Sequence, residues 1–265
     1  METPYDGSSS GAADLYAQTR GPALRPAWDL LQKLSLQRGE RVLLLPARDG
    51  RLLQVLASFH REGAITALEF HPLLARRARA LMEESPGASM VEVLEAPPEL
   101  VPLPGGQDAL VCHCHLPAFF DHGGFARAVR RNLRPGGRFA VQVPMEGFCE
   151  PLEEALLDTL ASRKDLPDPE EIPAPLDPEE IYEDFRESGF RSLEKTEKLY
   201  LERFATAMEA ADILFAGGGW AGLEELTPAQ KEETAREVRL RLVKRLRKDQ
   251  EVELPFRRLL LFGKR

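Results

Sequence analysis

The stretch Leu133-Arg-Pro-Gly-Gly-Arg-Phe-Ala-Val-Gln-Val-Pro144 joins a tight turn to a short apolar run. Arg134-Pro-Gly-Gly137 ends a helix predicted for 124–133, because proline and paired glycines do not continue a helix. The run at 138–143 is nearly all apolar, which is typical of a strand that is covered on both faces of its sheet. A helix that leads into such a strand is half of a βαβ unit.

The same unit repeats toward the N-terminus. Strands are predicted at 41–45, 64–69, 90–94 and 109–113, and helices at 26–34, 52–60 and 71–84. This alternation predicts an α/β fold with a doubly wound, mostly parallel sheet. Ligands of such sheets lie beyond the carboxyl ends of the strands. The residues of interest are therefore 46–50, 69–71, 95–97 and 112–116.

The C-terminal part completes the sheet. It is predicted to contain a helix at 178–188, strands at 191–201 and 253–262, and between these strands a helical insertion whose last helix begins with the capping box Thr227-Pro-Ala-Gln230. We divide the chain into a flexible N-terminus (1–20), a core (21–162), a Pro-rich linker (163–178) and a C-terminal part (179–265). The sheet then has seven strands, and a helical lid at about 205–250 precedes the last one.

Composition excludes several classes of function. The net charge of −8 argues against general affinity for nucleic acid. The sequence contains no apolar run of the roughly 18 residues that a membrane span needs, and no signal peptide opens it. Three cysteines are too few for a disulfide framework. We expect a cytoplasmic protein without a membrane association.

The order of these sequence features resembles that in the class I S-adenosylmethionine-dependent methyltransferases. The features shared with that family are the strand and loop 42–50, the acid Glu69 at the end of the second strand, and 132–137. The second half resembles the trans-aconitate and malonyl-carrier-protein carboxyl methyltransferases in 177–182, 188–190 and 252–262. The resemblance implies a Rossmann-like methyltransferase fold, S-adenosylmethionine as cofactor and a small, carboxylated metabolite as substrate.

The loop after the first strand departs from the family pattern. Where the family has an acid the chain has Leu44, and Pro46 and Arg48 replace two of its glycines, so that Gly50 alone remains. Glycines let the backbone approach a ligand, and proline also removes an N–H donor. We interpret the cofactor loop as degenerate, which puts S-adenosylmethionine binding in doubt.

The resemblance assigns the remaining cofactor contacts residue by residue. Glu69 corresponds to the acid that accepts hydrogen bonds from the ribose hydroxyls, although a solvated carboxylate is the alternative. Ala96 takes the position that faces the adenine amine, and Glu95 could substitute for it. The full set of expected cofactor residues is Pro46, Ala47, Gly50, Glu69, Phe70, Glu95, Ala96 and His113.

The run Cys112-His-Cys-His115 suggests a metal site at first sight. In a strand, however, the two histidines share one face and the cysteines the other, so four ligands cannot converge and we expect no metal. His113 and His115 are candidate catalytic residues, as a general base or a partner for a carboxylate. The alternative is that they are packed and hydrogen-bonded in the loop. Cys149 is interpreted as a small buried apolar residue.

Candidate substrate residues are Arg48, Trp220 and Arg257, with Arg258 as an alternative to Arg257. Trp220 follows Gly217-Gly-Gly219, which is either a hinge or a plain helix break. The basic segment 239–248 is interpreted as lid packing with a solvated face, or else as a site for an acidic partner or an anionic substrate.

Two functions remain in competition. The first is a methyltransferase that acts on a small, carboxylated metabolite. The second is a methyltransferase-fold pseudoenzyme that has lost its cofactor and serves as a binding or scaffolding subunit. A homodimer or a complex with a partner protein is left open. Nucleic-acid modification is disfavoured by the charge and by His113-Cys-His-Leu116, where an Asn/Asp-Pro-Pro-Tyr/Phe motif would stand.

Overall fold

The first half of the chain alternates strands and helices as the sequence predicts. The computed structural model describes residues 24–60, 62–70, 72–95, 106–113, 121–171, 177–212, 223, 226–247 and 250–265. The expected flexible N-terminus (1–20) lies outside this set. The elements of the first half are α2 (Leu24–Leu34), β1 (Arg41–Leu45), α3 (Arg51–Phe59), β2 (Ala64–Glu69), α4 (Pro72–Glu83), β3 (Val91–Glu95), β4 (Gln107–His113), α5 (His122–Asn132) and β5 (Leu133–Pro144).

The second half supplies the last two strands and more helices. Its elements are α6 (Glu150–Ala161), α7 (Pro178–Glu187), β6 (Arg191–Thr206), α8 (Ala207–Asp212), α9 (Pro228–Leu246) and β7 (Gln250–Lys264). Short 3₁₀ helices occur at Ala88–Met90 and Pro169–Glu171. Among the described helices, none is long and apolar enough to cross a membrane.

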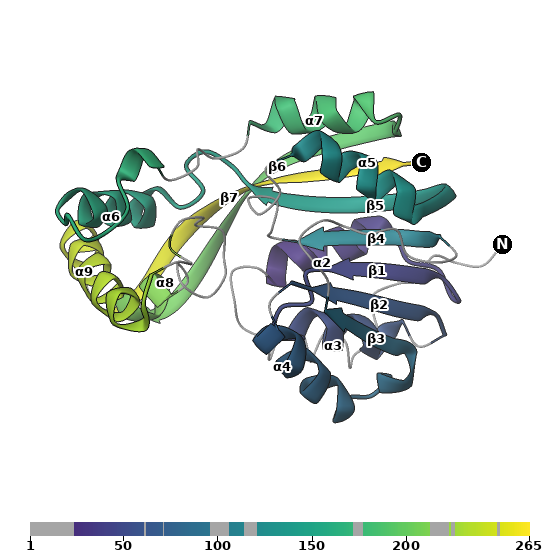
Figure 1. Cartoon of the computed structure of the whole chain (residues 1–265), viewed down its shortest axis with the longest axis horizontal. Helices are drawn as coiled ribbons and strands as arrows, with labels where there is room; N and C mark the ends of the chain where they lie inside the picture. Colours follow the sequence, from purple (N-terminus) through teal and green to yellow (C-terminus); the bar gives the residue numbers. More distant parts are fainter. Residues whose placement is uncertain are drawn as a thin grey trace.

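The strands form one seven-stranded sheet in the order β3-β2-β1-β4-β5-β7-β6 (Figure 1). Strands β1 to β5 pair in parallel, whereas β7 is antiparallel to both β5 and β6. The predicted fold class, a doubly wound and mostly parallel sheet, is therefore confirmed. Strands β1 and β4 lie at the centre of the sheet. Strands β2 and β3 lie on one side of β1, whereas β4 and all later strands lie on its other side.

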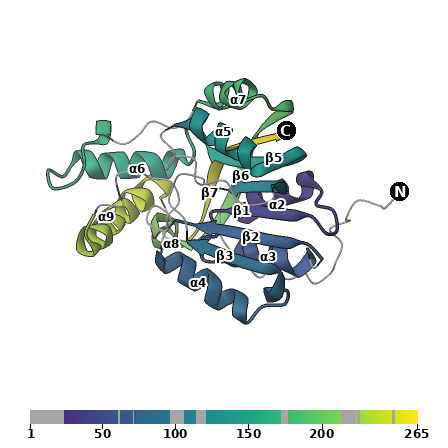
Figure 2. The ribbon, with the colours of Figure 1, turned by 45° about the vertical axis from the view of Figure 1, so that its right-hand side comes forward.

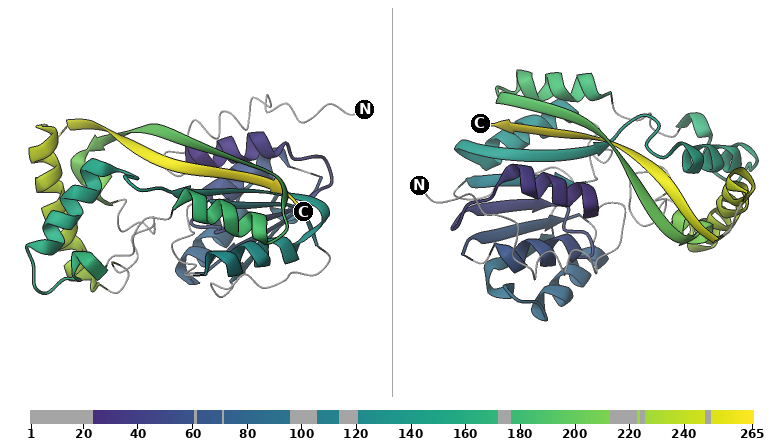
Figure 3. Two further views of the ribbon diagram at one scale, coloured as in Figure 1. Left: turned by 90° about the horizontal axis from the view of Figure 1, so that it is seen from above. Right: turned by 180° about the vertical axis from the view of Figure 1, so that it is seen from behind.

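Hydrophobic clusters cover both faces of the sheet. Alternate residues of β1 point to opposite sides: Val42 and Leu44 join the cluster under α2 and α3, whereas Leu43 and Leu45 join the cluster under α5 and α7. All four are fully buried. Figure 3 shows the two helical layers on either side of the strands. Burial of β1 on both faces explains its continuous apolar sequence.

A third cluster lies away from these layers. Strands β6 and β7 continue beyond the parallel strands as a long two-stranded ribbon, and α6, α8 and α9 pack at its far end (Figures 1 and 2). We call α6, α8 and α9 the helical lobe. Its core includes Leu152, Leu156, Ala210, Leu242 and Phe256. Figure 1 shows the lobe on the side toward which β1 and β4 point.

The Pro-Gly-Gly turn belongs to strand β5 rather than preceding it. Gln107 pairs with Leu133, and the register then shifts before Ala109 pairs with Arg138. Gly136 has φ +79°, and a Cβ on Gly137 would lie 2.9 Å from the Arg134 carbonyl oxygen and 3.0 Å from that of Gln107. Glycine is therefore required at 137 by close backbone approach, independently of any ligand.

Three elements differ from the sequence-based expectation. Strands β6 and β7 are longer than predicted, because they pair with each other beyond the sheet. Helix α6 is not predicted at all. Its buried residues Leu152, Ala155, Leu156 and Leu160 do follow helical spacing, so the signal is present in the sequence.

Candidate functional site

The loop from Pro46 to Gly50 folds across the end of β2. The Ala47 N–H donates to the Leu68 carbonyl at 2.7 Å, and the Arg48 N–H donates to Glu69 Oε2 at 2.5 Å. Within the loop, the Gly50 N–H donates to the Ala47 carbonyl at 3.0 Å. The backbone N–H groups of Ala47 and Arg48 thus fix the loop to the end of β2.

Glu69 is a buried carboxylate that organises this loop. It is 3% exposed, and its two oxygens accept the N–H groups of Arg48, at 2.5 Å, and of Phe70, at 3.0 Å. Hydrogen bonds from N–H groups offset the cost of burying a charged oxygen. These contacts fix the orientation of the Glu69 carboxylate beside the loop. Glu95 lies directly beside Glu69 in the β2–β3 register and is exposed.

Gly50 and Arg48 both adopt left-handed backbone conformations. Gly50 has φ +89°, and a Cβ there would lie 2.9 Å from the Ala78 Cα of α4. The packing of α4 against the start of α3 therefore explains this glycine without a ligand. Arg48 has φ +55° and is half-buried. A non-glycine residue in this region carries a backbone penalty of about 1–2 kcal/mol.

Leu44 occupies the position where the family has an acid, and it is a core residue. Its side chain is fully buried in the cluster beneath α2 and α3. The side chain packs on the sheet face rather than pointing beyond the strand end. The structure therefore gives Leu44 a packing role.

His113 lies at the end of β4 and is tied to the loop after β1. It is 3% exposed, and its Nε2 lies 3.0 Å from the Pro46 carbonyl oxygen. Because a carbonyl only accepts, Nε2 carries the hydrogen in this bond. This geometry corresponds to the packed and hydrogen-bonded alternative. His115, Ala96 and Trp220 lie outside the described residues, as do Cys114 and Gly217-Gly-Gly219.

The two arginines of β7 lie in different environments. The Arg257 side chain is exposed, and its backbone N–H donates to the Phe148 carbonyl at 2.7 Å. Arg258 is 2% exposed, and its guanidinium carbon lies 4.7 Å from the centroid of the Phe148 ring, a cation–π contact. Of the two, Arg258 is the buried cation.

A row of buried polar side chains crosses the sheet near the carboxyl ends of the strands. His113 pairs with Gln142, and Gln142 with Leu260, so these residues share one face with Arg258, two positions along β7. Gln142 is fully buried. Gln142 is not among the candidates expected from the sequence, although a lone amide within the apolar run 138–143 is a detectable signal.

The row continues onto β6 with Tyr200 and Glu202. The Tyr200 hydroxyl donates to Asp29 Oδ2 at 2.7 Å, and burial together with the Asp29 carboxylate raises the pKa of Tyr200. Burial also raises the pKa of the Glu202 carboxyl. Neither residue is identified from the sequence.

A surface pocket of about 310 Å³ lies elsewhere, between α2 and the β6–β7 ribbon. Its lining includes Asp29, Lys33, Lys198 and Phe262. Lys33 and Lys198 pair with Glu194 and Asp29, at 2.6 and 2.8 Å. Because none of the expected cofactor residues lines this pocket, we do not assign it to the cofactor.

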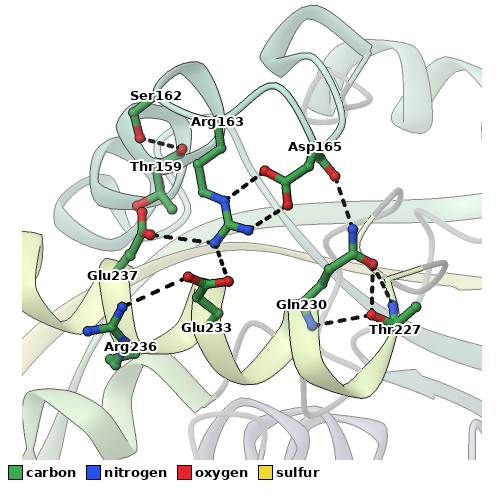
Figure 4. Close-up of polar contacts among 9 residues, drawn as sticks. All are labelled: Thr159, Ser162, Arg163, Asp165, Thr227, Gln230, Glu233, Arg236 and Glu237. Atoms are coloured by element: carbon green, nitrogen blue, oxygen red, sulfur yellow. Dashed lines mark hydrogen bonds and ion pairs between the residues drawn. The ribbon is translucent and has the colours of Figure 1, made fainter.

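The basic segment 239–248 packs against an acidic helix of the same chain. Arg245 of α9 forms ion pairs with Glu154 and Asp158 of α6, and Arg241 donates to the Ser162 hydroxyl at 2.8 Å. Figure 4 shows the next part of this interface, where Arg163 contacts Asp165, Glu233 and Glu237. Basic side chains of the segment thus contact α6 of the same chain, in agreement with the lid-packing interpretation.

Cys149 lies at the start of α6 and is fully buried, as expected. Burial raises the pKa of its thiol to about 12. The thiol therefore stays protonated at neutral pH and behaves as an apolar group.

Comparisons with known proteins agree with the observed fold. The family described as "Methyltransferase domain" matches residues 47–141. A trans-aconitate 2-methyltransferase from Methylobacterium nodulans is 31% identical over 122 residues, which are 45% of this chain. The matched segment spans 44% of that relative's length.

Solved structures extend the likeness to nearly the whole chain. The YcgJ protein from Bacillus subtilis superposes with a TM-score of 0.62 at 13% identity, covering 91% of this chain and 98% of that one. A phosphoethanolamine N-methyltransferase from Haemonchus contortus, solved with S-adenosylhomocysteine, gives a TM-score of 0.57 at 14% identity over 100% of this chain and 58% of that one. At these identities the likeness concerns the fold. Residues 47–141 thus match a methyltransferase domain, and the chain has the Rossmann-like fold of the class I S-adenosylmethionine-dependent methyltransferases.

Proposed function

We propose that the protein is an S-adenosylmethionine-dependent methyltransferase whose substrate is a small, carboxylated metabolite. The observation that carries the proposal is the pair of neighbouring carboxylates, Glu69 and Glu95, at the ends of β2 and β3 beside the Pro46–Gly50 loop. Hydroxyl and amine donors of a nucleoside fit such a pair. The similarity to a trans-aconitate 2-methyltransferase supports the substrate class.

The residues of the site fit one end of the cofactor better than the other. Glu69 takes the position of the family's ribose-binding acid at the end of β2, and the exposed Glu95 is available to an adenine amine. At the methionine end, Leu44 is a core residue and offers no carboxylate to the ammonium group. We therefore expect binding through the nucleoside, with lower affinity than a loop with the family's acid would give.

Methyl transfer to a carboxylate requires little acid–base catalysis from the protein. When bound, the cofactor supplies a methyl group on a positively charged sulfur, so that alignment and exclusion of water provide most of the rate. A carboxylate substrate is already ionised at neutral pH and needs no general base. The bond between His113 and the Pro46 carbonyl is compatible with this, because His113 then serves to position the loop.

A cation is needed to position the substrate carboxylate. Arg258 is the buried candidate on the sheet face that carries His113 and Gln142, and Arg48 is the half-buried candidate in the loop itself. Arginine is suited to this role because its planar fork can bind a carboxylate in a bidentate manner. Arg257, exposed on β7, is the third candidate.

The competing proposal is a binding subunit without cofactor. Two observations favour it: Leu44 is fully buried, and the carboxylate of Glu69 already accepts the Arg48 N–H. In that case the loop would be a structural connection between β1 and α3, held by Glu69 and His113.

Isothermal titration calorimetry with S-adenosylmethionine and S-adenosylhomocysteine distinguishes the two proposals. Micromolar binding is expected for the enzyme, and Glu69→Gln should weaken it at least about tenfold, or about 1.4 kcal/mol. The matched control is Glu62→Gln, an exposed acid in the turn before β2 that pairs with Arg38. The absence of heat and of a thermal shift at millimolar ligand would establish the pseudoenzyme instead.

A second variant tests the degenerate loop. Arg48→Gly removes a side chain from the loop at a left-handed position, where glycine is unstrained. We expect tighter binding of S-adenosylmethionine with a change in stability below about 1 kcal/mol. Unchanged or weaker binding would show that Arg48 does not hinder the cofactor.

A further inference from the structure

Strand β6 is the outermost strand of the sheet, and no described residue pairs with its outer edge. It is 16 residues long and contains no proline. Natural proteins usually protect such an edge with prolines or charged side chains, by keeping it short or by covering it, because an open edge can pair with another chain. Strand β6 carries charged residues, among them Lys195 and Lys198, but it is long. Near its start, α7 covers β6: Lys195 pairs with Glu179 and lies 5.2 Å from the Tyr182 ring centroid. Residues 197–203 lie beyond that cover.

The two faces of residues 197–203 differ in exposure. On one face Tyr200 and Phe204 are buried. On the other face, four consecutive same-face positions are all exposed, namely Glu197, Leu199, Leu201 and Arg203. Leu199 is 59% exposed and Leu201 is 49% exposed. Two neighbouring leucines on an open strand edge are a feature of association surfaces.

This face is complementary to itself when it is read in reverse. In an antiparallel pairing of two copies about a two-fold axis at Tyr200, Leu199 lies opposite Leu201 of the second copy. Glu197 then lies opposite Arg203 of the second copy, and symmetry repeats each pair. Directly opposite side chains are about 4.5–5.5 Å apart at Cβ, close enough for apolar and opposite-charge contacts.

Other registers lose this complementarity. A parallel pairing in register sets Glu197 against Glu197 and Arg203 against Arg203, and like charges in direct opposition are destabilising. An antiparallel pairing shifted by two residues sets either Lys195 or Leu199 against Arg203. The charge pattern thus favours the two-fold arrangement centred on Tyr200.

We propose that two copies of this chain associate through β6, edge to edge and antiparallel, so that their sheets form one continuous sheet. On the buried face, this arrangement brings Lys198 of the second copy opposite Glu202. Glu202 Oε1 is a buried acceptor without a hydrogen-bond partner among the described residues. Each cross-strand pair of this kind contributes only weakly. The dimer is therefore weak and reversible, with dissociation in the micromolar range.

Sedimentation equilibrium of the full chain, from low-micromolar to several-hundred-micromolar concentration, tests the association. The wild type should shift from monomer to dimer over this range. Leu199→Lys combined with Leu201→Lys should leave it monomeric, whereas the control Leu240→Lys, at an equally exposed leucine on α9, should not. A wild type that stays monomeric at the highest concentration overturns the proposal, and so does a dimer that the double variant leaves intact.

Charge reversal tests the register. Glu197→Arg sets Arg against Arg203 in both symmetric pairs, and Arg203→Glu sets Glu against Glu197, so each variant alone should dissociate at least about tenfold more readily. An equimolar mixture restores both opposite-charge pairs and should recover the dimer. Arg203 also pairs with Glu253 of its own chain at 2.9 Å, an exposed contact of small effect, so thermal melts verify that each variant is folded. Failure of the mixture to associate contradicts the register.

Discussion

Glu202 carries a charge that is poorly accommodated in the folded chain. Burial raises the pKa of its carboxyl above the ordinary 4.5, and the charges of Arg25 and Arg258 only partly oppose this effect. Because the folded pKa exceeds the unfolded one, the folded state binds the proton more tightly. The free energy of unfolding therefore falls as the pH rises through a window that begins at 4.5 and extends upward.

Glu202→Gln should remove this dependence. The variant should be more stable than the wild type at about pH 7 and nearly equal to it below the ordinary carboxyl pKa of 4.5. Urea denaturation at both pH values measures the difference, at a protein concentration low enough to keep the chain monomeric. Lower stability of the variant at neutral pH would mean that the ionised carboxylate is well paired.

At the residue scale, the sequence indicates candidate residues for the site but not their contacts. The strand ends and Glu69 follow from hydrophobic periodicity and from the family resemblance. The sequence does not reveal that Glu69 accepts the Arg48 N–H, or that the φ of Gly50 and its approach to Ala78 both require glycine. Such contacts join residues that are more than twenty positions apart, and only the packed elements bring them together.

At the element scale, helix α9 has a cap that was predicted and is confirmed. The Thr227 Oγ1 accepts the Gln230 N–H, the Gln230 Oε1 accepts the Thr227 N–H, and the Gln230 amide reaches the Asp165 carbonyl (Figure 4). Capping signals are readable from sequence because they depend on residues three positions apart. The extension of β6 and β7 beyond the sheet cannot be predicted in this way, because each strand is stabilised there by pairing with the other.

Thr227→Ala tests the cap. Loss of the hydroxyl leaves an N–H at the start of α9 without its acceptor and should lower the free energy of unfolding of the helical lobe by about 1 kcal/mol. Thr227→Ser retains the acceptor and is the matched control. Amide hydrogen exchange in the first turn of α9 measures the effect. Equal exchange in both variants would show that the rest of the α6–α9 interface fixes the helix end.

At the scale of the whole molecule, the chain consists of two parts, the sheet with its helices and the helical lobe, and only the lobe depends on the other part. The sheet with its two helical layers holds two apolar clusters, and the helical lobe holds a third at the far end of the β6–β7 ribbon. The lobe is built on a ribbon that is itself paired to β5 in the sheet. The lobe therefore depends on the sheet, whereas the parallel strands do not depend on the lobe.

This dependence predicts that a core mutation in the lobe affects the lobe alone, whereas a core mutation in the sheet affects both parts. Leu242 in α9 and Leu53 in α3 are both fully buried, and truncation to alanine costs about 2–5 kcal/mol at such positions. Leu242→Ala should accelerate amide exchange in α6 and α9 while β1 and β4 keep their protection, because local units open separately. Leu53→Ala should accelerate exchange in both parts, since the ribbon loses its anchor when the sheet opens. If Leu242→Ala accelerates exchange in β1 and β4 to the same extent, the chain unfolds as one cooperative unit and the lobe does not open by itself.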